Sequence, residues 1–298
     1  MRKAGAAGKV RPAPAAVLLA WTLTWVLSGC GPAPATAPVP TAAASGTATD
    51  TAPVPTAGTA PGGIPGGLWA PVPGESWQWQ LSGAVDPAVE AQTFDVDYET
   101  TSREEVAALK AQGRGMICYL SAGSWEDFRG DAGGFPEAVR GRELSGWPGE
   151  RWLDIRRMDV LLPLMAARMD ICAAKGFDGV EPDNVDGYLN DTGFPLTAQD
   201  QLDYNRALAE LAHARGLSVG LKNDIDQIPA LVADFDFAVN EECFRYAECD
   251  SYAPFAAAGK AVLHVEYEGP LAFCAESERL GFSSMLKPLH LGPDRQPC

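Results

Sequence analysis

Short apolar runs alternate with longer amphipathic stretches from about residue 68 to the C-terminus. Four stretches have helical spacing of apolar residues, and each ends in glycine, the common residue just past a helix C-terminus. They are 102–113, 164–176, 198–216 and 270–281. Ser102 and Glu105 have the spacing of a capping box, which marks the start of the first helix. Eight runs have the length and composition of strands: 77–81, 93–98, 115–121, 177–182, 217–223, 235–241, 261–267 and 282–287.

Repeated helix, glycine and strand units predict parallel strands joined by crossover helices. Eight such strands in residues 68–298 predict an α/β fold, a (β/α)8 TIM barrel in a single domain. The alternative is a doubly wound open sheet. That fold usually carries a glycine-rich phosphate loop after its first strand, and the "WQWQLSGAVDP" segment does not have one.

The first 29 residues have the pattern of an export signal. A basic start is followed by the apolar run "AAVLLAWTLTWVL", which is short for a membrane-spanning helix. The run ends in "LSGC", which resembles a lipobox, so residues 1–29 are expected to be a lipoprotein signal peptide and Cys30 the lipidated residue. The alternative is an ordinary signal peptide with a chance cysteine. We expect an exported bacterial lipoprotein at the cell surface, bound to the membrane through Cys30.

Residues 30–67 are almost entirely Ala, Pro, Thr, Gly and Ser, with no aromatic residue and one charge, Asp50. Such a segment cannot bury enough apolar surface to offset its ordering entropy. It is expected to be a disordered linker.

The chain has a formal net charge of -16. Four of the 23 Lys and Arg and one of the 39 Asp and Glu precede residue 68, so the predicted domain holds 19 basic and 38 acidic side chains. This balance argues against a nucleic-acid partner and suits a neutral or cationic one.

Six cysteines remain when Cys30 is set aside, and an even count in an exported protein predicts disulfides. Cys243 and Cys249 can close a tight loop. Pairing of Cys274 with Cys298 and of Cys118 with Cys172 is one possibility for the rest. A zinc site is the competing interpretation, but the sequence has no CxxC motif or His-rich partner to support it.

Polar side chains gather where the predicted strands end, and in a TIM barrel those ends form the active-site face. The segment "GFDGVEPDNVDGY", residues 176–188, places Glu181 and Asp183 on one face of a strand. Aromatic residues at the same rim, among them Tyr188 and Tyr246, offer flat faces to sugar rings. The residues predicted to bind substrate are Asp97, Tyr119, Trp125, Glu181, Asn184, Asp186, Tyr204, Lys222, Asn240 and Glu266.

Paired carboxylates across a barrel mouth are typical of glycoside hydrolysis, in which one protonates the leaving oxygen and the other attacks or activates water. The sequence has no GxSxG or HExxH motif, and three histidines argue against a His-based metal site. We therefore predict no metal and no cofactor. The alternatives are a calcium or turn cluster at Glu181, Asp183 and Asp186, which lacks the EF-hand register, and a non-catalytic protein that binds polysaccharide.

The segments "ICYLSAGSWE", "WLDIR", "GFDGVEPDNVDGY" and "AVNEECFRYAEC" resemble glycoside hydrolase family 114, the endo-α-1,4-polygalactosaminidase-like TIM barrels. The resemblance implies endo-cleavage of polysaccharide that contains α-1,4-linked galactosamine. It also implies Asp183 as nucleophile or base and Glu241 as general acid/base. The alternation of strand residues does not separate Glu241 from Glu242, or Glu181 from Asp183, and another glycan substrate remains open.

Overall fold

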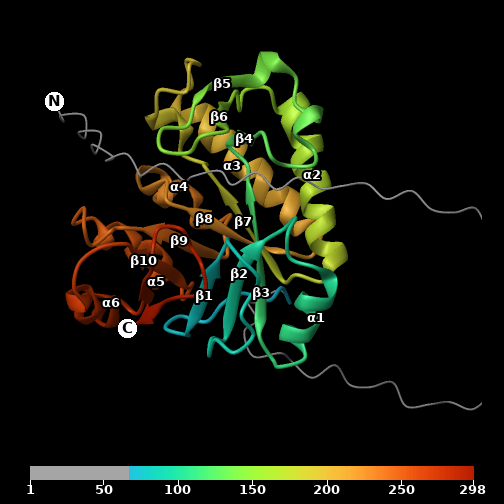
Figure 1. Ribbon diagram of the computed structural model, residues 1–298. Helices are drawn as coiled ribbons and strands as arrows, with labels where there is room; N and C mark the ends of the chain where they lie inside the picture. The colour runs from blue at the N-terminus through green and yellow to red at the C-terminus, as the bar shows by residue number, and fades with distance from the viewer. Residues whose placement is uncertain (1–66) are drawn as a thin grey trace, which may run out of the picture. The chain divides into compact units, whose positions relative to one another are not determined.

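The computed structural model of the protein describes residues 67–298, and eight parallel strands in chain order form its centre (Figure 1). The chain has the TIM-barrel α/β fold. The eight predicted strands are confirmed, with ends that differ by no more than two residues. They are β1 (Trp77–Gln80), β2 (Thr93–Asp97), β3 (Gly115–Ser121), β7 (Gly179–Asp183), β8 (Ser218–Lys222), β9 (Phe237–Glu241), β10 (Val262–Glu266) and β11 (Ser283–Leu286).

The predicted signal peptide 1–29, Cys30 and all but the last residue of the predicted linker 30–67 lie outside the described residues. Among residues 67–298 no helix combines the length and the apolar character needed to cross a membrane.

Helices cover the outer face of the sheet. They are α1 (Arg103–Lys110), α2 (Met158–Lys175), α3 (Ala198–His213), α4 (Ile228–Leu231), α5 (Ala253–Ala257) and α6 (Cys274–Leu280). The capping box at Ser102 and Glu105 is present, because each side chain accepts from the other's backbone N–H. Gly176 ends α2 in the left-handed conformation at φ 92°, which a residue with a side chain adopts only with strain. The short α4 and α5 were not predicted.

Two apolar clusters pack against the two faces of the sheet. One joins outward residues of the strands, such as Phe94 and Met116, to the helices through residues such as Leu161. The other contains strand residues that alternate with these and point into the barrel, including Trp77 and Phe237. Full burial of such an apolar side chain stabilises the fold by about 1.5–3 kcal/mol.

The C-terminal segment lies along the seam between the first and last parallel strands. Within the described residues β1 pairs only with β2, and β11 pairs with β10 and with the antiparallel β12 (Gln296–Pro297). The backbone N–H of Leu81 donates to Leu291 O at 2.9 Å, and Arg295 Nη1 donates to Trp77 O at 2.7 Å. These bonds connect the C-terminal segment to β1 and so satisfy backbone groups that the barrel would otherwise leave open.

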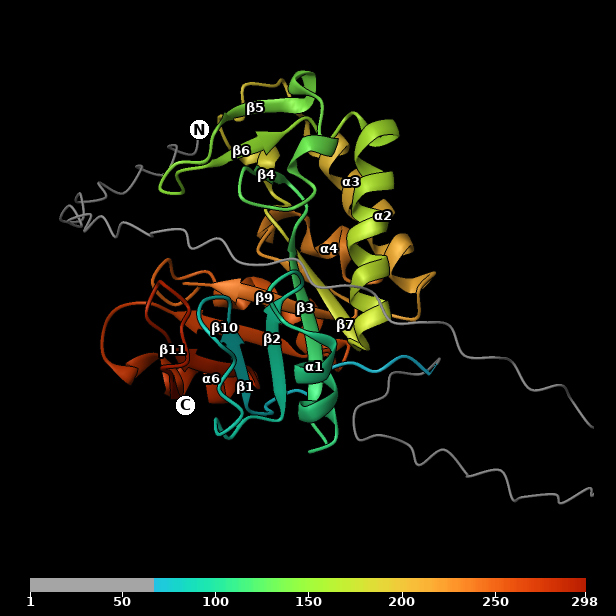
Figure 2. The ribbon, with the colours of Figure 1, turned by 45° about the vertical axis from the view of Figure 1, so that its right-hand side comes forward.

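A three-stranded antiparallel sheet interrupts the barrel between β3 and α2. It consists of β4 (Ser124–Glu126), β5 (Arg140–Glu143) and β6 (Glu150–Leu153) in the order β4-β6-β5. Figures 1 and 2 both show it beyond the carboxyl end of β3, which is the end where an active site is expected. We call residues 124–153 the inserted sheet; none of its strands was among those predicted from the sequence.

All three disulfide pairings considered from the sequence are present: Cys118–Cys172, Cys243–Cys249 and Cys274–Cys298. The first joins β3 to α2 in the buried core and the last joins α6 to the end of the chain. In the chain-entropy view, the 54-residue separation of the first pair stabilises the fold by about 4 kcal/mol and the 6-residue separation of the second by about 2 kcal/mol.

Candidate active site

One lysine joins two carboxylates at the carboxyl ends of three neighbouring strands. Asp183 is the last residue of β7, Lys222 the last of β8 and Glu241 the last of β9. Lys222 Nζ lies 2.8 Å from Asp183 Oδ1 and 2.9 Å from Glu241 Oε2. These two oxygens are therefore less than about 6 Å apart, a spacing close to that of retaining glycosidases and shorter than that of inverting ones.

The chain turns sharply after each of these strand ends. Asn184, Asn223 and Glu242 have φ values of 62°, 50° and 62°, in the left-handed region that residues other than glycine rarely adopt. Asn tolerates this region better than Glu does, so the strain is greatest at Glu242. Strained residues of this kind gather at functional sites, and here they leave the last strand side chain at the barrel mouth.

Asp183 is surrounded by hydrogen-bond donors. Its Oδ2 accepts from the Tyr119 hydroxyl at 2.9 Å, and its Oδ1 accepts from the Asn184 backbone N–H at 2.8 Å as well as from Lys222. Burial alone would raise the pKa of Asp183, but the Lys222 charge and these hydrogen bonds outweigh it and lower the pKa below its usual value. Asp183 is therefore an ionised carboxylate at neutral pH.

Glu241 is held from both sides and is the more open of the two carboxylates. Its Oε1 accepts from the Tyr267 hydroxyl, and its Oε2 accepts from Asn223 Nδ2 at 3.3 Å. The side chain of Glu241 is 27% exposed, against 17% for Asp183. Burial and the nearby Glu241 charge raise the pKa of Tyr267 above its usual range, so this phenol stays protonated and donates.

Both carboxylates line a cavity of about 800 Å³. Its other walls are aromatic and acidic, and many of them come from the inserted sheet. The aromatic lining residues are Trp79, Tyr119, Phe128, Trp147, Trp152 and Tyr267. A cavity of this size with aromatic walls and a few polar groups suits a sugar ring or a short stretch of polysaccharide.

The structure brings five of the predicted substrate-binding residues to this cavity: Asp97, Tyr119, Asn184, Asp186 and Lys222. Asp97 is occupied by Arg129, whose Nη1 lies 2.5 Å from Asp97 Oδ2. Asp186 carries no ion pair among the described residues, and burial, with the Asp183 charge as a second cause, raises its pKa to about 6.

Glu181 shares the face of Asp183, as the strand alternation predicts, but it lies deeper in the barrel. It is fully buried, its Oε1 is 3.8 Å from Lys222 Nζ, and it does not line the cavity. Burial raises its pKa well above the usual value, and the neighbouring Asp95 charge adds to the effect. Glu181 therefore lies beside Lys222 inside the barrel and does not reach the cavity.

Two predicted aromatic contacts lie away from the cavity. Tyr204, on the inward side of α3, is fully buried and its hydroxyl donates to Ala122 O at 2.8 Å. Trp125 is covered by the Arg140 guanidinium 4.3 Å from its ring centre, and its indole N–H donates to Ala132 O. The structure therefore brings neither ring to the main cavity.

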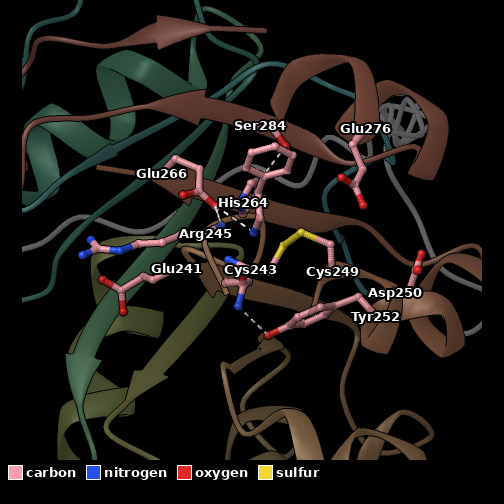
Figure 3. Close-up of a disulfide and its surroundings, with 12 residues drawn as sticks. Glu241, Cys243, Arg245, Cys249, Asp250, Tyr252, His264, Glu266, Glu276 and Ser284 are labelled. Atoms are coloured by element: carbon pink, nitrogen blue, oxygen red, sulfur yellow. Dashed lines mark hydrogen bonds and ion pairs between the residues drawn. A yellow bond between two sulfur atoms is a disulfide. The ribbon is translucent and has the colours of Figure 1, made fainter. Parts of the chain in front are cut away.

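Two predicted polar contacts also lie behind the sheet. Asn240 of β9 and Glu266 of β10 occupy strand positions whose side chains point away from the barrel interior. Asn240 Nδ2 donates to the Tyr252 hydroxyl at 2.9 Å, and Glu266 Oε1 lies 2.9 Å from His264 Nε2 (Figure 3). Neither lines the main cavity, although Asn240 lines a smaller cavity beside it, so their contact with substrate stays a prediction.

The inserted sheet supplies several lining residues that were not predicted from the sequence, among them Trp147 and Glu150. Ser124 Oγ donates to Glu150 Oε2 at 2.8 Å, and burial raises the pKa of Glu150 to about 7, with the Glu126 and Asp183 charges acting in the same direction. The tryptophan in the turn "SGWPGE" was an available signal, because an indole ring offers a large flat apolar face to a ligand.

Several solved structures resemble this chain over most of its length. A crystal structure of Aspergillus fumigatus Ega3 in complex with galactosamine shares 38% identity and a TM-score of 0.73, covering 77% of this chain and 97% of that chain. The glycoside hydrolase domain of PelA from Pseudomonas aeruginosa has 15% identity and a TM-score of 0.58, with coverage of 72% and 95%. At that identity PelA shows the fold alone.

A sequence relative and a family model complete the comparison. An uncharacterized protein of Deinococcus radiodurans is 31% identical over 207 residues, which is 61% of this chain, and the chain spans 63% of that relative's length. The model of glycoside-hydrolase family GH114 matches residues 59–298. The chain therefore belongs to glycoside-hydrolase family GH114.

Proposed function

We propose that this member of the family cleaves polysaccharide that contains α-1,4-linked galactosamine, as an endo-acting hydrolase. The observation that carries the proposal is the carboxylate pair Asp183 and Glu241, bridged by Lys222 inside an acidic, aromatic-walled cavity. The 38% identical Ega3, whose crystal structure contains galactosamine, supports the class of substrate.

In the proposed mechanism Glu241 donates a proton to the glycosidic oxygen while Asp183 attacks the anomeric carbon. The bond to the leaving sugar breaks, and a covalent bond forms between Asp183 and the sugar that remains. Glu241 then takes a proton from water, which attacks the same carbon and releases Asp183 as a carboxylate. The low pKa of Asp183 suits a nucleophile, and the greater exposure of Glu241 suits proton exchange with substrate and water.

The separation of the two carboxylates predicts the stereochemistry. Nearest oxygens less than about 6 Å apart leave no room for a water molecule between the sugar and Asp183, so the double displacement retains the anomeric configuration. An α-linked substrate would therefore give an α-configured product first.

The charges of the cavity suit a cationic sugar. Its Lys and Arg lining residues are paired with carboxylates: Lys222 as above, Arg129 with Asp97, and Arg142 with Asp191. Glu150 and Asp186 line the cavity without an ion pair among the described residues. Their carboxylates are placed to receive the ammonium group of galactosamine. An N-acetyl group carries no charge and could not form the same ion pair.

The test is to incubate the purified protein with deacetylated and acetylated α-1,4-galactosamine polysaccharide and to read the products by mass spectrometry. We expect oligosaccharides from the deacetylated polymer with the native protein, and none with Asp183→Asn or Glu241→Gln. Glu242→Gln is the matched control, because it changes the neighbouring glutamate, which pairs with Arg245 outside the cavity. Binding without cleavage by the native protein would favour a non-catalytic binding protein, and cleavage of another glycan alone would overturn the substrate.

The lipid anchor is a separate proposal that rests on the sequence pattern at Cys30. We expect incorporation of a labelled fatty acid at Cys30 and recovery of the protein with membranes. Cys30→Ser should abolish the label and release the protein from the membrane fraction. Equal labelling of the variant would contradict the anchor.

A further inference from the structure

A second cavity of about 280 Å³ adjoins the first on the side of β8 and β9. Asp186, Asn223 and Glu241 line both cavities, so the second one opens directly beside the proposed acid/base. We call it the distal subsite. Its other walls include the exposed ring of Tyr246. Of the three carboxylates near Lys222, only Glu241 lines it.

The distal subsite is acidic and has no compensating base. Asp224, Asp226 and Glu248 line it, no Lys or Arg does, and none of these three carboxylates forms an ion pair within the described part of the chain. In the main cavity, by contrast, Lys222 and Arg129 neutralise the carboxylates next to them. Carboxylates left together without a cation repel each other, and a bound cation would relieve that repulsion.

Asp224 gives a second indication that this cavity binds a ligand, because one of its buried oxygens has no hydrogen-bond donor. The residue is 1% exposed and lines the distal subsite, and its Oδ2 accepts from Asn205 Nδ2 at 2.9 Å. Its Oδ1 has no partner at hydrogen-bond geometry, although the Tyr188 side chain lies nearby. A buried carboxylate oxygen without a donor is costly, so a ligand that brings an N–H or O–H group would fit there.

Tyr246 stands on a loop that is fixed before any ligand arrives. The Cys243–Cys249 disulfide closes the loop, and the Tyr246 backbone N–H donates to Glu242 O at 3.1 Å. Behind the loop Glu266 Oε1 accepts from the Phe244 backbone N–H at 2.9 Å. The Tyr246 side chain is 60% exposed. A rigid, exposed ring beside carboxylates is a suitable surface for the apolar face of a sugar that carries an amine, because little entropy is lost on binding.

We propose that the distal subsite binds a further amino-sugar unit of the polysaccharide, beyond the sugars at the cleavage point. The Tyr246 ring packs against that sugar, Asp226 and Glu248 receive its ammonium group, and Asp224 forms a hydrogen bond to the sugar through Oδ1. The inference rests on the proposed function for the identity of the polysaccharide, but it concerns binding and does not require cleavage. It makes the subsite selective for galactosamine over N-acetylgalactosamine at a position away from the bond that breaks.

The experiment measures calorimetric binding of α-1,4-galactosamine oligosaccharides of increasing length to full-length Asp183→Asn protein, which keeps the chain intact on the enzyme. The same background then carries Tyr246→Ala, or Asp226→Asn with Glu248→Gln. We expect longer oligosaccharides to bind the background about tenfold more tightly than a disaccharide, and both sets of variants to lose this gain while disaccharide affinity is unchanged. Glu276→Gln, an acidic change on α6 outside both cavities, should keep the gain.

Tyr246→Phe keeps the ring and serves as the second variant if Tyr246→Ala fails to fold; it should retain the gain. Unchanged binding of long oligosaccharides in the carboxylate variants would overturn the proposal, as would an equal loss at every length. N-acetylated oligosaccharides should show no gain with length, and a full gain would also overturn it. A length-dependent gain in a protein that cleaves no galactosamine polymer would uphold the distal subsite while the proposed hydrolysis fails, so the two are separable.

Discussion

At the scale of single residues, the site is organised by Lys222. The strand alternation correctly places Glu181 and Asp183 on one face, but the sequence does not tell how deep each lies, and depth decides which of them lines the cavity. The same alternation turns Asn240 and Glu266 outward, because the apolar Val239 and Val265 occupy the interior positions beside them. A polar residue at a strand end is therefore a candidate whose direction only the structure decides.

Replacing Lys222 with methionine should lower kcat by about 100-fold or more, because the proposed nucleophile loses its fixed positive neighbour. Lys222 also holds the pKa of Asp183 low, so that pKa should rise and the acidic limb of the kcat/KM profile should move to higher pH. The measurement is kcat/KM across pH for both proteins, with circular dichroism to verify folding. An unmoved acidic limb with activity within about threefold of native would contradict the role of Lys222.

At the scale of elements, the regular barrel could be predicted and the inserted sheet could not. The barrel strands are apolar runs of ordinary length, and four helical patterns lie between them, so the sequence alone gives the number and order of the strands. The inserted strands read "SWE", "RGRE" and "ERWL", which are short and charged and show no clean alternation. The pairing of β4 with β6 joins segments about 25 residues apart, which no local pattern records.

The inserted sheet makes a testable contribution through Trp147, which is 48% exposed and lines the main cavity. Trp147→Ala should raise KM about tenfold and leave kcat nearly unchanged, since a sugar-packing ring would stabilise the bound substrate and the transition state alike. Steady-state kinetics on a soluble oligosaccharide would measure both constants. Ile171→Ala, at an exposed position on α2, is the control; a large fall in kcat for Trp147→Ala with KM unchanged would argue against simple packing.

For the molecule as a whole, the acidic residues differ in how strongly the fold changes their pKa. Burial raises the pKa of Asp95 to about 7, Glu150 to about 7, Asp186 to about 6 and Asp224 to about 8. The composition correctly indicated an acidic domain, yet it could not show which of its carboxyls the fold would shield from water. Closure of the seam by residues 291–298 was equally beyond the sequence, because it joins segments about 200 residues apart.

These raised pKa values predict how stability depends on pH. Each of the four carboxyls holds its proton more tightly in the folded chain than in the unfolded chain, so folding loses stability as pH rises from about 4 through the folded pKa values. The melting temperature should therefore fall by several degrees between pH 5 and pH 8. Calorimetry across this range checks it, with Glu150→Gln expected to flatten the slope. A melting temperature that is constant or rises from pH 5 to pH 8 would contradict the buried acidic site.

The most direct test of the carboxylate pair is the anomeric configuration of the first product, followed by NMR during cleavage of an α-1,4-galactosamine oligosaccharide. The closeness of Asp183 and Glu241, both within hydrogen-bonding distance of one Lys222 nitrogen, predicts that the α-anomer forms first and that the β-anomer appears later by mutarotation. Initial release of the β-anomer would mean a single displacement by water, and it would contradict the role of Asp183 as nucleophile.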